Sequence, residues 1–293
     1  MFSISRSSQA GSFKIPSRSR SMTSRFQPRL EALEDRCLPS TVNNDIIGRV
    51  NETGDWWLGT SNGSSFANSF ATNWSSVPTW VDVQSGDFNG DGFTDIAGRY
   101  LETGQWWVAQ SNGSGGFKNV LWDTWSTRVT WLDVKVGDFN GDGKMDIVGR
   151  AAESGQWWVA QSTGSSFTNS LWATWAADGP SVTWVDVKVG DLNGDGKADI
   201  TGRWLEGGSW WTAISNGSAF TTSQWAQWST AATWVDVQVG DFNGDGKADI
   251  TGRWLEGGSW WTAVSNGKGF TTSQWTQWST AVTWIDVQNG VYV

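Results

Sequence analysis

The chain has 293 residues, with 26 Trp, one Cys and no His. The lack of His excludes a Ser-His-Asp or Cys-His catalytic centre and a His-based metal site, and the single Cys excludes an intramolecular disulfide framework. Residues 1–40 carry seven basic and three acidic residues, whereas the remainder carries 13 basic and 26 acidic residues. The acidic remainder argues against nucleic acid as a partner, because phosphate binding requires Lys and Arg. No apolar run approaches the ~20 residues of a membrane span.

Residues 1–39 are Ser- and Arg-rich and lack hydrophobic periodicity, which predicts a disordered basic arm. The arm contains no apolar stretch of the ~7–15 residues that a secretory signal needs. Its end, from Arg29 to Leu38, resembles the LEPR-XLL-type N-terminal segment of bacterial surface or exported proteins, although it departs from the name-giving letters. The resemblance implies sorting to the envelope or exterior; a solvated charged tail is the alternative interpretation.

Residues 40–293 are predicted to be one domain built from five repeats. The motif D-I-x-G-R begins at Asp45, Asp95, Asp146, Asp199 and Asp249, with spacings of 50, 51, 53 and 50 residues. An adjacent Trp pair follows each motif, at Trp56/Trp57, Trp106/Trp107, Trp157/Trp158, Trp210/Trp211 and Trp260/Trp261. The third unit is longer because of an insertion at residues 176–181. Repetition at this period indicates a propeller, a solenoid or an array.

Each unit is predicted to form four short antiparallel strands, as in one propeller blade. In the fourth unit these are residues 233–239, 249–254, 259–264 and 270–278, separated by Asp/Gly, Gly-Gly and Asn-Gly turn signals. Adjacent strand residues point to opposite faces, so the Trp pairs predict that both faces of each sheet are buried. Each buried indole N–H is expected to find a hydrogen-bond partner.

The two ends of the repeat region predict a closed ring. Residues 40–293 begin and end at the same point of the repeat, within one loop, so they make up five whole units with no residues left over. We therefore expect residues 283–288 to lie beside residues 45–49 and to complete a shared blade. An open solenoid would instead show polar capping repeats, and closure would remove the exposed strand edges.

Four loops have the pattern D-x-N-x-D-G-x-x-D. Side-chain oxygens at positions 1, 3, 5 and 9, a backbone oxygen at position 7 and Gly at position 6 are typical of the first part of a Ca²⁺ loop. Three close carboxylates would repel one another without a cation. The predicted ligands are Asp87, Asn89, Asp91, Phe93 and Asp95; Asp138, Asn140, Asp142, Lys144 and Asp146; Asp191, Asn193, Asp195, Lys197 and Asp199; and Asp241, Asn243, Asp245, Lys247 and Asp249. The sequence thus predicts four Ca²⁺ ions and no fifth, with Asx turns lacking metal as the alternative.

Residues 239–250, which read VGDFNGDGKADI, resemble the FG-GAP/VCBS-type repeat. The resemblance extends over residues 40–293 as repeats and implies a Ca²⁺-bearing β-propeller of a secreted or surface protein, as in integrin-like heads and some fungal lectins. This chain departs from the commoner seven-blade rings in having five units, and from typical members in its Trp content.

Two further sets of residues recur in every unit. The Arg of D-I-x-G-R and the Asp of T-W-x-D-V are expected to pair across a hairpin and so to link two strands of each blade. A second set of Trp offers aromatic faces on which a sugar could stack, although an inter-blade core is the alternative. The candidate stacking residues are Trp122, Trp125, Trp172, Trp175, Trp225, Trp228, Trp275 and Trp278.

The sequence favours a non-catalytic, calcium-binding adhesion or binding module. We expect a monomer in the extracellular space or at the cell surface, with a glycan or envelope polymer as partner. A structural scaffold without a specific ligand is one alternative. A glycan-cleaving hydrolase is another, but it needs two carboxyl groups in different environments. Asp123 and Asp178 lack counterparts in other units, and both are expected in loops.

Overall fold

A computed structural model describes residues 44–290, which belong to one compact unit beginning at Asn44. All of the regular structure in these residues is β-strand. The predicted basic arm, its sorting segment and the domain boundary at residue 40 lie outside the described residues. Among residues 44–290, no helix is long and apolar enough to cross a membrane.

Nineteen strands form five antiparallel sheets, which we call blades 1 to 5. Blade 1 contains β1–β3, and blades 2 to 5 contain β4–β7, β8–β11, β12–β15 and β16–β19. From β1 to β19 the strands are Ile46–Arg49, Asp55–Ser61, Phe66–Asn73, Trp80–Gly86, Asp95–Tyr100, Gln105–Ser111, Phe117–Thr124, Trp131–Gly137, Asp146–Ala151, Gln156–Ser162, Phe167–Thr174, Trp184–Gly190, Asp199–Trp204, Ser209–Ser215, Phe220–Gln227, Trp234–Gly240, Asp249–Trp254, Ser259–Ser265 and Phe270–Gln277. The prediction of an all-β fold with five blades is confirmed, and the strand bounds predicted for the fourth unit agree to within one residue.

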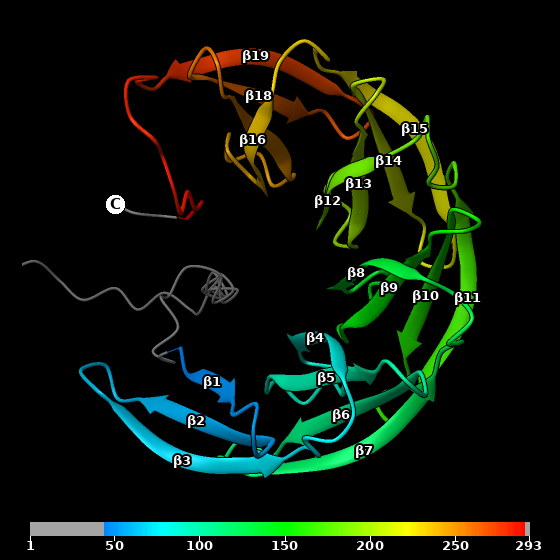
Figure 1. Ribbon diagram of the computed structural model, residues 1–293, viewed down its shortest axis with the longest axis vertical. Helices are drawn as coiled ribbons and strands as arrows, with labels where there is room; N and C mark the ends of the chain where they lie inside the picture. Colours follow the sequence, from blue (N-terminus) through cyan, green and yellow to red (C-terminus); the bar gives the residue numbers. More distant parts are fainter. Residues whose placement is uncertain (1–43, 291–293) are drawn as a thin grey trace, which may run out of the picture. The chain divides into compact units, whose positions relative to one another are not determined.

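The blades follow one another in chain order along an arc, with β4, β8, β12 and β16 on its inner side (Figure 1). Neighbouring inner strands contact one another, and so do neighbouring outer strands from β3 to β19. The hydrophobic core is divided into four clusters, each drawn from two successive blades. The apolar surface is therefore buried between blades, as expected for sheets that need both faces covered.

A chain of indole rings crosses every junction between blades. In blade 2, Trp106 makes an edge-to-face contact with Trp125, with ring centroids 5.1 Å apart, and Trp125 lies 4.5 Å from Trp131 of blade 3. The same arrangement recurs at the other junctions. Aromatic contacts of this kind add about 0.5–1.5 kcal/mol each to the free energy of burial. The recurring Trp residues thus join one blade to the next.

The glycine of D-I-x-G-R makes room for this chain of rings. A Cβ atom at Gly149 would lie 2.8 Å from Cζ3 of Trp125, and Gly98, Gly202 and Gly252 face the corresponding indoles in the same way. A side chain at any of these positions would displace the indole of the preceding blade. The repeated motif therefore encodes packing between blades.

Indole N–H groups differ from the sequence-based expectation. The first Trp of each adjacent pair is buried, yet its Nε1 has no hydrogen-bond partner within residues 44–290. Each of these five rings makes an edge-to-face contact with the next indole at 5.0–5.1 Å. The second Trp of each pair is only partly buried or exposed, so the predicted burial of both faces is incomplete.

The predicted Arg–Asp pairs are confirmed in blades 2 to 5. The four ion pairs are Arg99–Asp82, Arg150–Asp133, Arg203–Asp186 and Arg253–Asp236. Each Asp lies at a β-bulge and has a φ of 52–55°, a conformation that Asp tolerates better than most residues. The bulge was not predicted, and it turns each carboxylate toward the buried Arg.

The predicted closing strand is not formed. Blade 1 has three strands instead of four, and residues 283–290 form no strand. This tail lies against blade 5, where Trp284 stacks on Trp278 and the Asn289 side chain donates to the Val239 carbonyl at 2.8 Å. The tail thus packs on blade 5 as the innermost strand of a following blade would. Its Asp286 makes no ion pair, and neither does Arg49 on β1, among the described residues.

Candidate functional site

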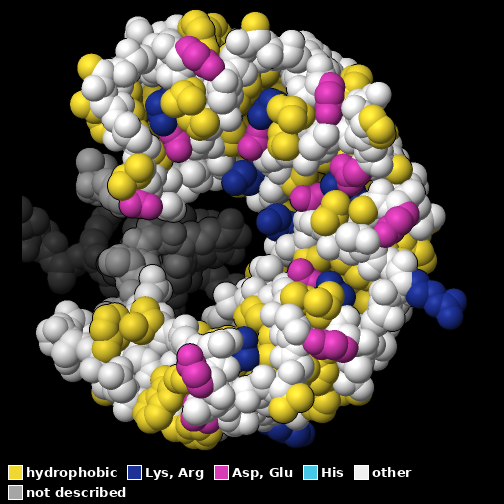
Figure 2. Space-filling view, viewed as in Figure 1, with side chains coloured by type: hydrophobic (Ala, Val, Ile, Leu, Met, Phe, Trp, Pro, Cys, Tyr) yellow, Lys and Arg dark blue, Asp and Glu magenta, His cyan; other side chains and the backbone are white. Residues whose placement is uncertain are grey.

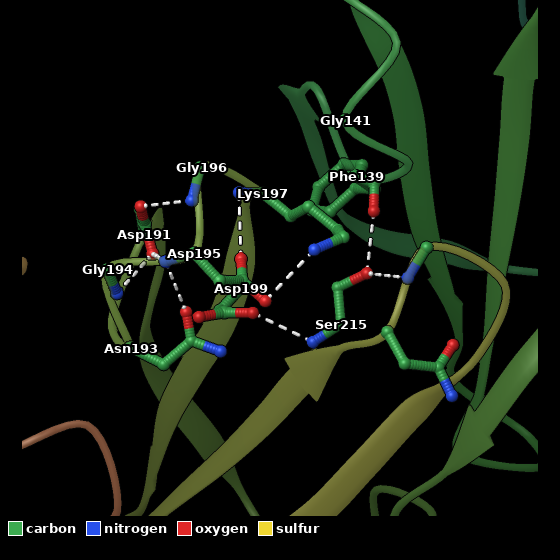
Figure 3. A network of polar contacts seen from close by, with 12 residues as sticks. Phe139, Gly141, Asp191, Asn193, Gly194, Asp195, Gly196, Lys197, Asp199 and Ser215 are labelled. Carbon is green, nitrogen blue, oxygen red and sulfur yellow. Dashed lines mark hydrogen bonds and ion pairs between the residues drawn. The ribbon is translucent and has the colours of Figure 1, made fainter.

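The four acidic loops have nearly identical geometry, and Figure 3 shows the one that connects β12 to β13. Asp191 accepts hydrogen bonds from the backbone N–H groups of Gly194, Asp195 and Gly196 at 2.7–3.1 Å. Asn193 accepts from the Asp195 N–H at 2.9 Å. These bonds wrap the backbone around the first carboxylate, which is how Asx residues shape a tight loop.

The last Asp of each loop is buried and ties the loop to the sheet. Asp199 accepts from the backbone N–H of Leu192 at 3.0 Å and of Ser215 at 2.8 Å. The Ser215 hydroxyl in turn donates to the Phe139 carbonyl in the loop of the preceding blade, at 2.6 Å (Figure 3). The Ala198 N–H donates to the Asp138 carbonyl at 2.8 Å. The loops of successive blades are therefore connected by hydrogen bonds.

Burial raises the pKa of the last Asp in these loops. Loss of water around Asp146 raises its pKa to about 7, the charges of Asp142 and Asp138 act in the same direction, and amide hydrogen bonds oppose both. Burial likewise raises the pKa of Asp199 to about 7 and of Asp95 to about 6. A nearby cation would favour the charged form of all three carboxylates.

The donor set of each loop suits Ca²⁺, which prefers carboxylate, amide and carbonyl oxygens. The structure does not, however, gather the predicted ligands into one group: within residues 44–290, no three His, Cys, Asp or Glu side chains are placed so as to hold a metal ion. Three loops also carry a Lys at position 7 that forms an ion pair with the Asp at position 5, as Lys197 does with Asp195 at 3.0 Å. The role of all twenty predicted ligands in metal binding stays a prediction.

Two clefts lie at equivalent positions, one at each side of blade 3. The polar cleft lies between blades 2 and 3, has a volume of about 440 Å³ and is lined by Thr124, Trp125, Ser126, Arg128, Val129, Trp131, Ala151, Glu153, Ser154, Gln156, Trp158 and Asn169. The indole cleft lies between blades 3 and 4, has a volume of about 320 Å³ and is lined by Thr174, Trp175, Ala176, Val182, Trp184, Trp204, Trp211 and Thr222. Figure 2 shows one face of the described unit, on which hydrophobic side chains form separate clusters with acidic side chains beside them.

The polar cleft combines aromatic faces with hydrogen-bonding groups. Trp131 and Trp158 are half-buried. The Trp131 N–H donates to the Ser126 carbonyl at 3.1 Å, and the Trp158 N–H donates to the Gln156 side chain at 3.3 Å. Because both N–H groups are used within the protein, the carbon faces of the rings are what a ligand would meet.

The candidate stacking residues are mostly in the core. Trp122, Trp125, Trp172, Trp175, Trp225 and Trp228 are each no more than 8% exposed, so their faces are covered by protein. Trp275 is 48% exposed and Trp278 is half-buried, because no blade follows them among the described residues. The prediction of an exposed stacking surface is therefore wrong for the first six. The Trp pairs were predicted to be core, which is wrong for the half-buried rings Trp158 and Trp211 of the clefts. The half-buried Trp131 and Trp184 recur in T-W-x-D-V but were not predicted as cleft residues.

The acidic residues without counterparts are used structurally. Asp123 accepts from the Trp125 indole and from the Asn169 amide, at 3.1 and 2.7 Å. Asp178, in the insertion of the third unit, forms an ion pair with Arg150. Asp55 also lacks a counterpart, which the sequence comparison overlooked, and it accepts from the Asn73 amide at 2.7 Å. These contacts leave all three carboxylates in structural roles.

Residues 87–149 match the family model described as FG-GAP-like repeat. This stretch is similar to an FG-GAP-like repeat. It runs from the first intact acidic loop through blade 2 to β9, and the same motifs recur in the other units. The predicted resemblance to FG-GAP repeats is confirmed. Comparison with curated proteins gave no match.

The chain is similar to several solved structures. A lectin from Agrocybe aegerita, described as recognising non-reducing terminal N-acetylglucosamine, is 21% identical with a TM-score of 0.63; the match covers 80% of this chain and 63% of the lectin chain. The pore of the Photorhabdus luminescens Tc holotoxin is 16% identical with a TM-score of 0.45, over 81% of this chain and 12% of that chain. The β-propeller domain of Cps50 from Myceliophteria thermophila is 6% identical with a TM-score of 0.35, over 80% and 89% of the two chains.

Proposed function

We propose that this FG-GAP-like propeller is a non-catalytic carbohydrate-binding module and that the polar cleft holds the sugar. The observation that carries the proposal is the pairing of two half-exposed indoles, Trp131 and Trp158, with the planar polar side chains of Glu153, Gln156 and Asn169. Sugars present C–H surfaces that pack on aromatic faces and hydroxyls that need donors and acceptors. The similarity to the N-acetylglucosamine-recognising lectin supports the same ligand class, with a terminal N-acetylated sugar as the first candidate.

Ca²⁺ has a structural part in this proposal. The oxygens of each acidic loop would hold the ion, and its charge would offset the repulsion that accompanies the raised pKa of Asp95, Asp146 and Asp199. A loop that lacks a bidentate Glu is expected to bind Ca²⁺ in the range of about 10⁻⁴–10⁻³ M, which fits an extracellular or cell-surface location. The hydrogen bonds from Ser215 and Ala198 to the preceding loop would then pass the rigidity of one loop to the next.

A glycan array tests the proposal, using the full chain in Ca²⁺ and in chelator. We expect binding to terminal N-acetylated sugars, lost in Trp158→Ala and retained in Trp57→Ala. Trp57 occupies the matching position in blade 1 and is 46% exposed, but within residues 44–290 no preceding blade supplies a second wall there. Binding to no glycan by a folded protein would instead favour a structural scaffold. Equal loss in both variants would show that the polar cleft is not the site.

A further inference from the structure

The indole cleft differs chemically from the polar cleft, although the two occupy equivalent positions. Its walls contain four indoles, Trp175, Trp184, Trp204 and Trp211, where the polar cleft has three and places Ala151 at the position of Trp204. No charged or amide side chain lines it. A sugar would find few partners for its hydroxyl groups there, so the cleft is built for a different ligand.

Three of the four indoles are oriented by hydrogen bonds to the protein. Trp175 donates to the Thr222 hydroxyl at 3.3 Å, Trp184 to the Ala176 carbonyl at 2.9 Å and Trp204 to the Ser181 carbonyl at 3.1 Å. Their N–H groups are thereby occupied. Trp184, Trp204 and Trp211 are partly exposed and present ring carbon atoms to the cleft, whereas Trp175 is buried and supports Trp184 from behind. Trp175 and Trp184 lie 4.5 Å apart with an interplanar angle of 41°.

The sequence around Trp204 is adapted to hold its ring. A Cβ atom at Gly207 would lie 2.3 Å from Cε3 of Trp204, so the indole lies directly on the backbone of the turn. The third unit, which has Ala151 at the equivalent position, has Ser154 at the equivalent turn position. The insertion of the third unit contributes Ala176 to the lining and is fixed by the ion pair between Asp178 and the buried Arg150.

A carboxylate stands at the edge of the indole cleft. Glu206 accepts hydrogen bonds from the backbone and side chain of Thr183, which lies between the lining residues Val182 and Trp184. The Thr183 hydroxyl, and to a lesser extent Trp204, lowers the pKa of Glu206 below its ordinary value. The polar cleft carries the equivalent carboxylate, Glu153, together with the cationic Arg128, whose charge offsets it, whereas no cationic side chain lines the indole cleft. The electrostatics therefore favour a cation more in the indole cleft than in the polar cleft.

We propose that the indole cleft is an aromatic cage for a trimethylammonium group, as in choline and phosphocholine. Indole faces attract such cations through their quadrupoles, most strongly where the contact is desolvated. The volume of about 320 Å³ lies within the range of small-ligand sites. The next junction has the same residue types, with Trp228, Trp234, Trp254 and Trp261, but lacks the insertion. It is therefore the candidate for a second cage.

Ligand-observed NMR titration of the full chain tests this proposal. The probes are choline and its neutral isostere 3,3-dimethylbutan-1-ol. We expect choline to bind and the isostere to bind at least about tenfold more weakly. The Trp204→Ala/Trp254→Ala variant should lose choline binding but keep glycan binding, whereas Trp158→Ala should keep choline binding. Glu206→Gln, which preserves all rings and can still accept one of the two hydrogen bonds from Thr183, should weaken the binding of choline at the indole cleft and leave that of the isostere unchanged.

Three results would overturn the proposal: no choline binding by the folded protein, equal binding of choline and the isostere, or unchanged choline binding in the double Trp variant. Sedimentation with phosphatidylcholine vesicles distinguishes the two sources of the group. Cosedimentation that excess choline abolishes would assign the cage to a lipid headgroup, and choline binding without cosedimentation would assign it to a soluble or glycan-linked phosphocholine. Either result supports the cage, and neither depends on the glycan proposal.

Discussion

The ion pair between a buried Arg and the Asp of the bulge permits a direct comparison of two blades. In blade 4, the Arg203 side chain is 6% exposed and has Asp186 as its ion-pair partner among the described residues. In blade 3, the Arg150 side chain is 1% exposed and pairs with both Asp133 and Asp178. Removing the bulge carboxylate therefore leaves a buried charge unpaired in blade 4, whereas the buried charge in blade 3 keeps one partner.

We expect Asp186→Asn to lower the free energy of unfolding by about 3 kcal/mol, the lower end of the range for breaking a buried pair. Asn retains an oxygen acceptor and tolerates the φ of 55° at this position. Asp133→Asn should cost only about 1 kcal/mol, the worth of one hydrogen bond, because Asp178 still neutralises Arg150. Combining Asp133→Asn with Asp178→Asn should raise the loss to about 3 kcal/mol.

Urea unfolding followed by tryptophan fluorescence measures these differences under matched conditions. The midpoints should fall in the order wild type, Asp133→Asn, Asp186→Asn, with the slopes unchanged. Equal losses in the two single variants would refute the reasoning, because they would show that the second carboxylate of blade 3 does not compensate for the first.

Three further predictions concern packing, metal and closure. Trp157→Ala, at a fully buried ring, should cost about 3–5 kcal/mol in the same unfolding assay, whereas the 46%-exposed Trp57→Ala should cost much less. Chelator should lower the Tm, and Asp199→Asn should reduce the increase in Tm that Ca²⁺ produces. A Tm that changes neither with chelator nor with this substitution would argue against structural Ca²⁺. In a closed ring, residues 283–290 would pair with β1 in the same register in which β16 pairs with β17. A variant with Ile47→Cys and Gln288→Cys, and with the native Cys replaced, should then form an intramolecular disulfide. A monomer that forms no such bond would have the open arrangement of Figure 1.

The repeat made the fold predictable from the sequence. Asn-Gly and Gly-Gly turns and alternating strands located the blades, and the Trp pairs indicated that the sheets stack. The sequence could not show which Trp face a cleft, because that depends on the offset between blades: Trp157 is buried while its neighbour Trp158 lines the polar cleft. Local pattern constrains a strand, but it does not determine how two sheets are displaced against each other.

The candidate site was less predictable for a similar reason. The acidic loops were evident from spacing alone, yet the structure directs Asp199 to the amides of Leu192 and Ser215, the latter sixteen residues away. The clefts combine residues of two blades, so no single motif encodes them. The sequence alone shows that the fourth unit has Trp204 where the third unit has Ala151. Only the structure shows that these two residues occupy the same position in two clefts, and that the difference makes one cleft more aromatic than the other.

A crystal structure of the full chain grown in Ca²⁺ and soaked with N-acetylglucosamine tests the central claim most directly. The account predicts sugar density in the polar cleft, packed on Trp131 and Trp158 and hydrogen-bonded to Glu153, Gln156 or Asn169. Density for the sugar at another place, with the polar cleft empty, would contradict it.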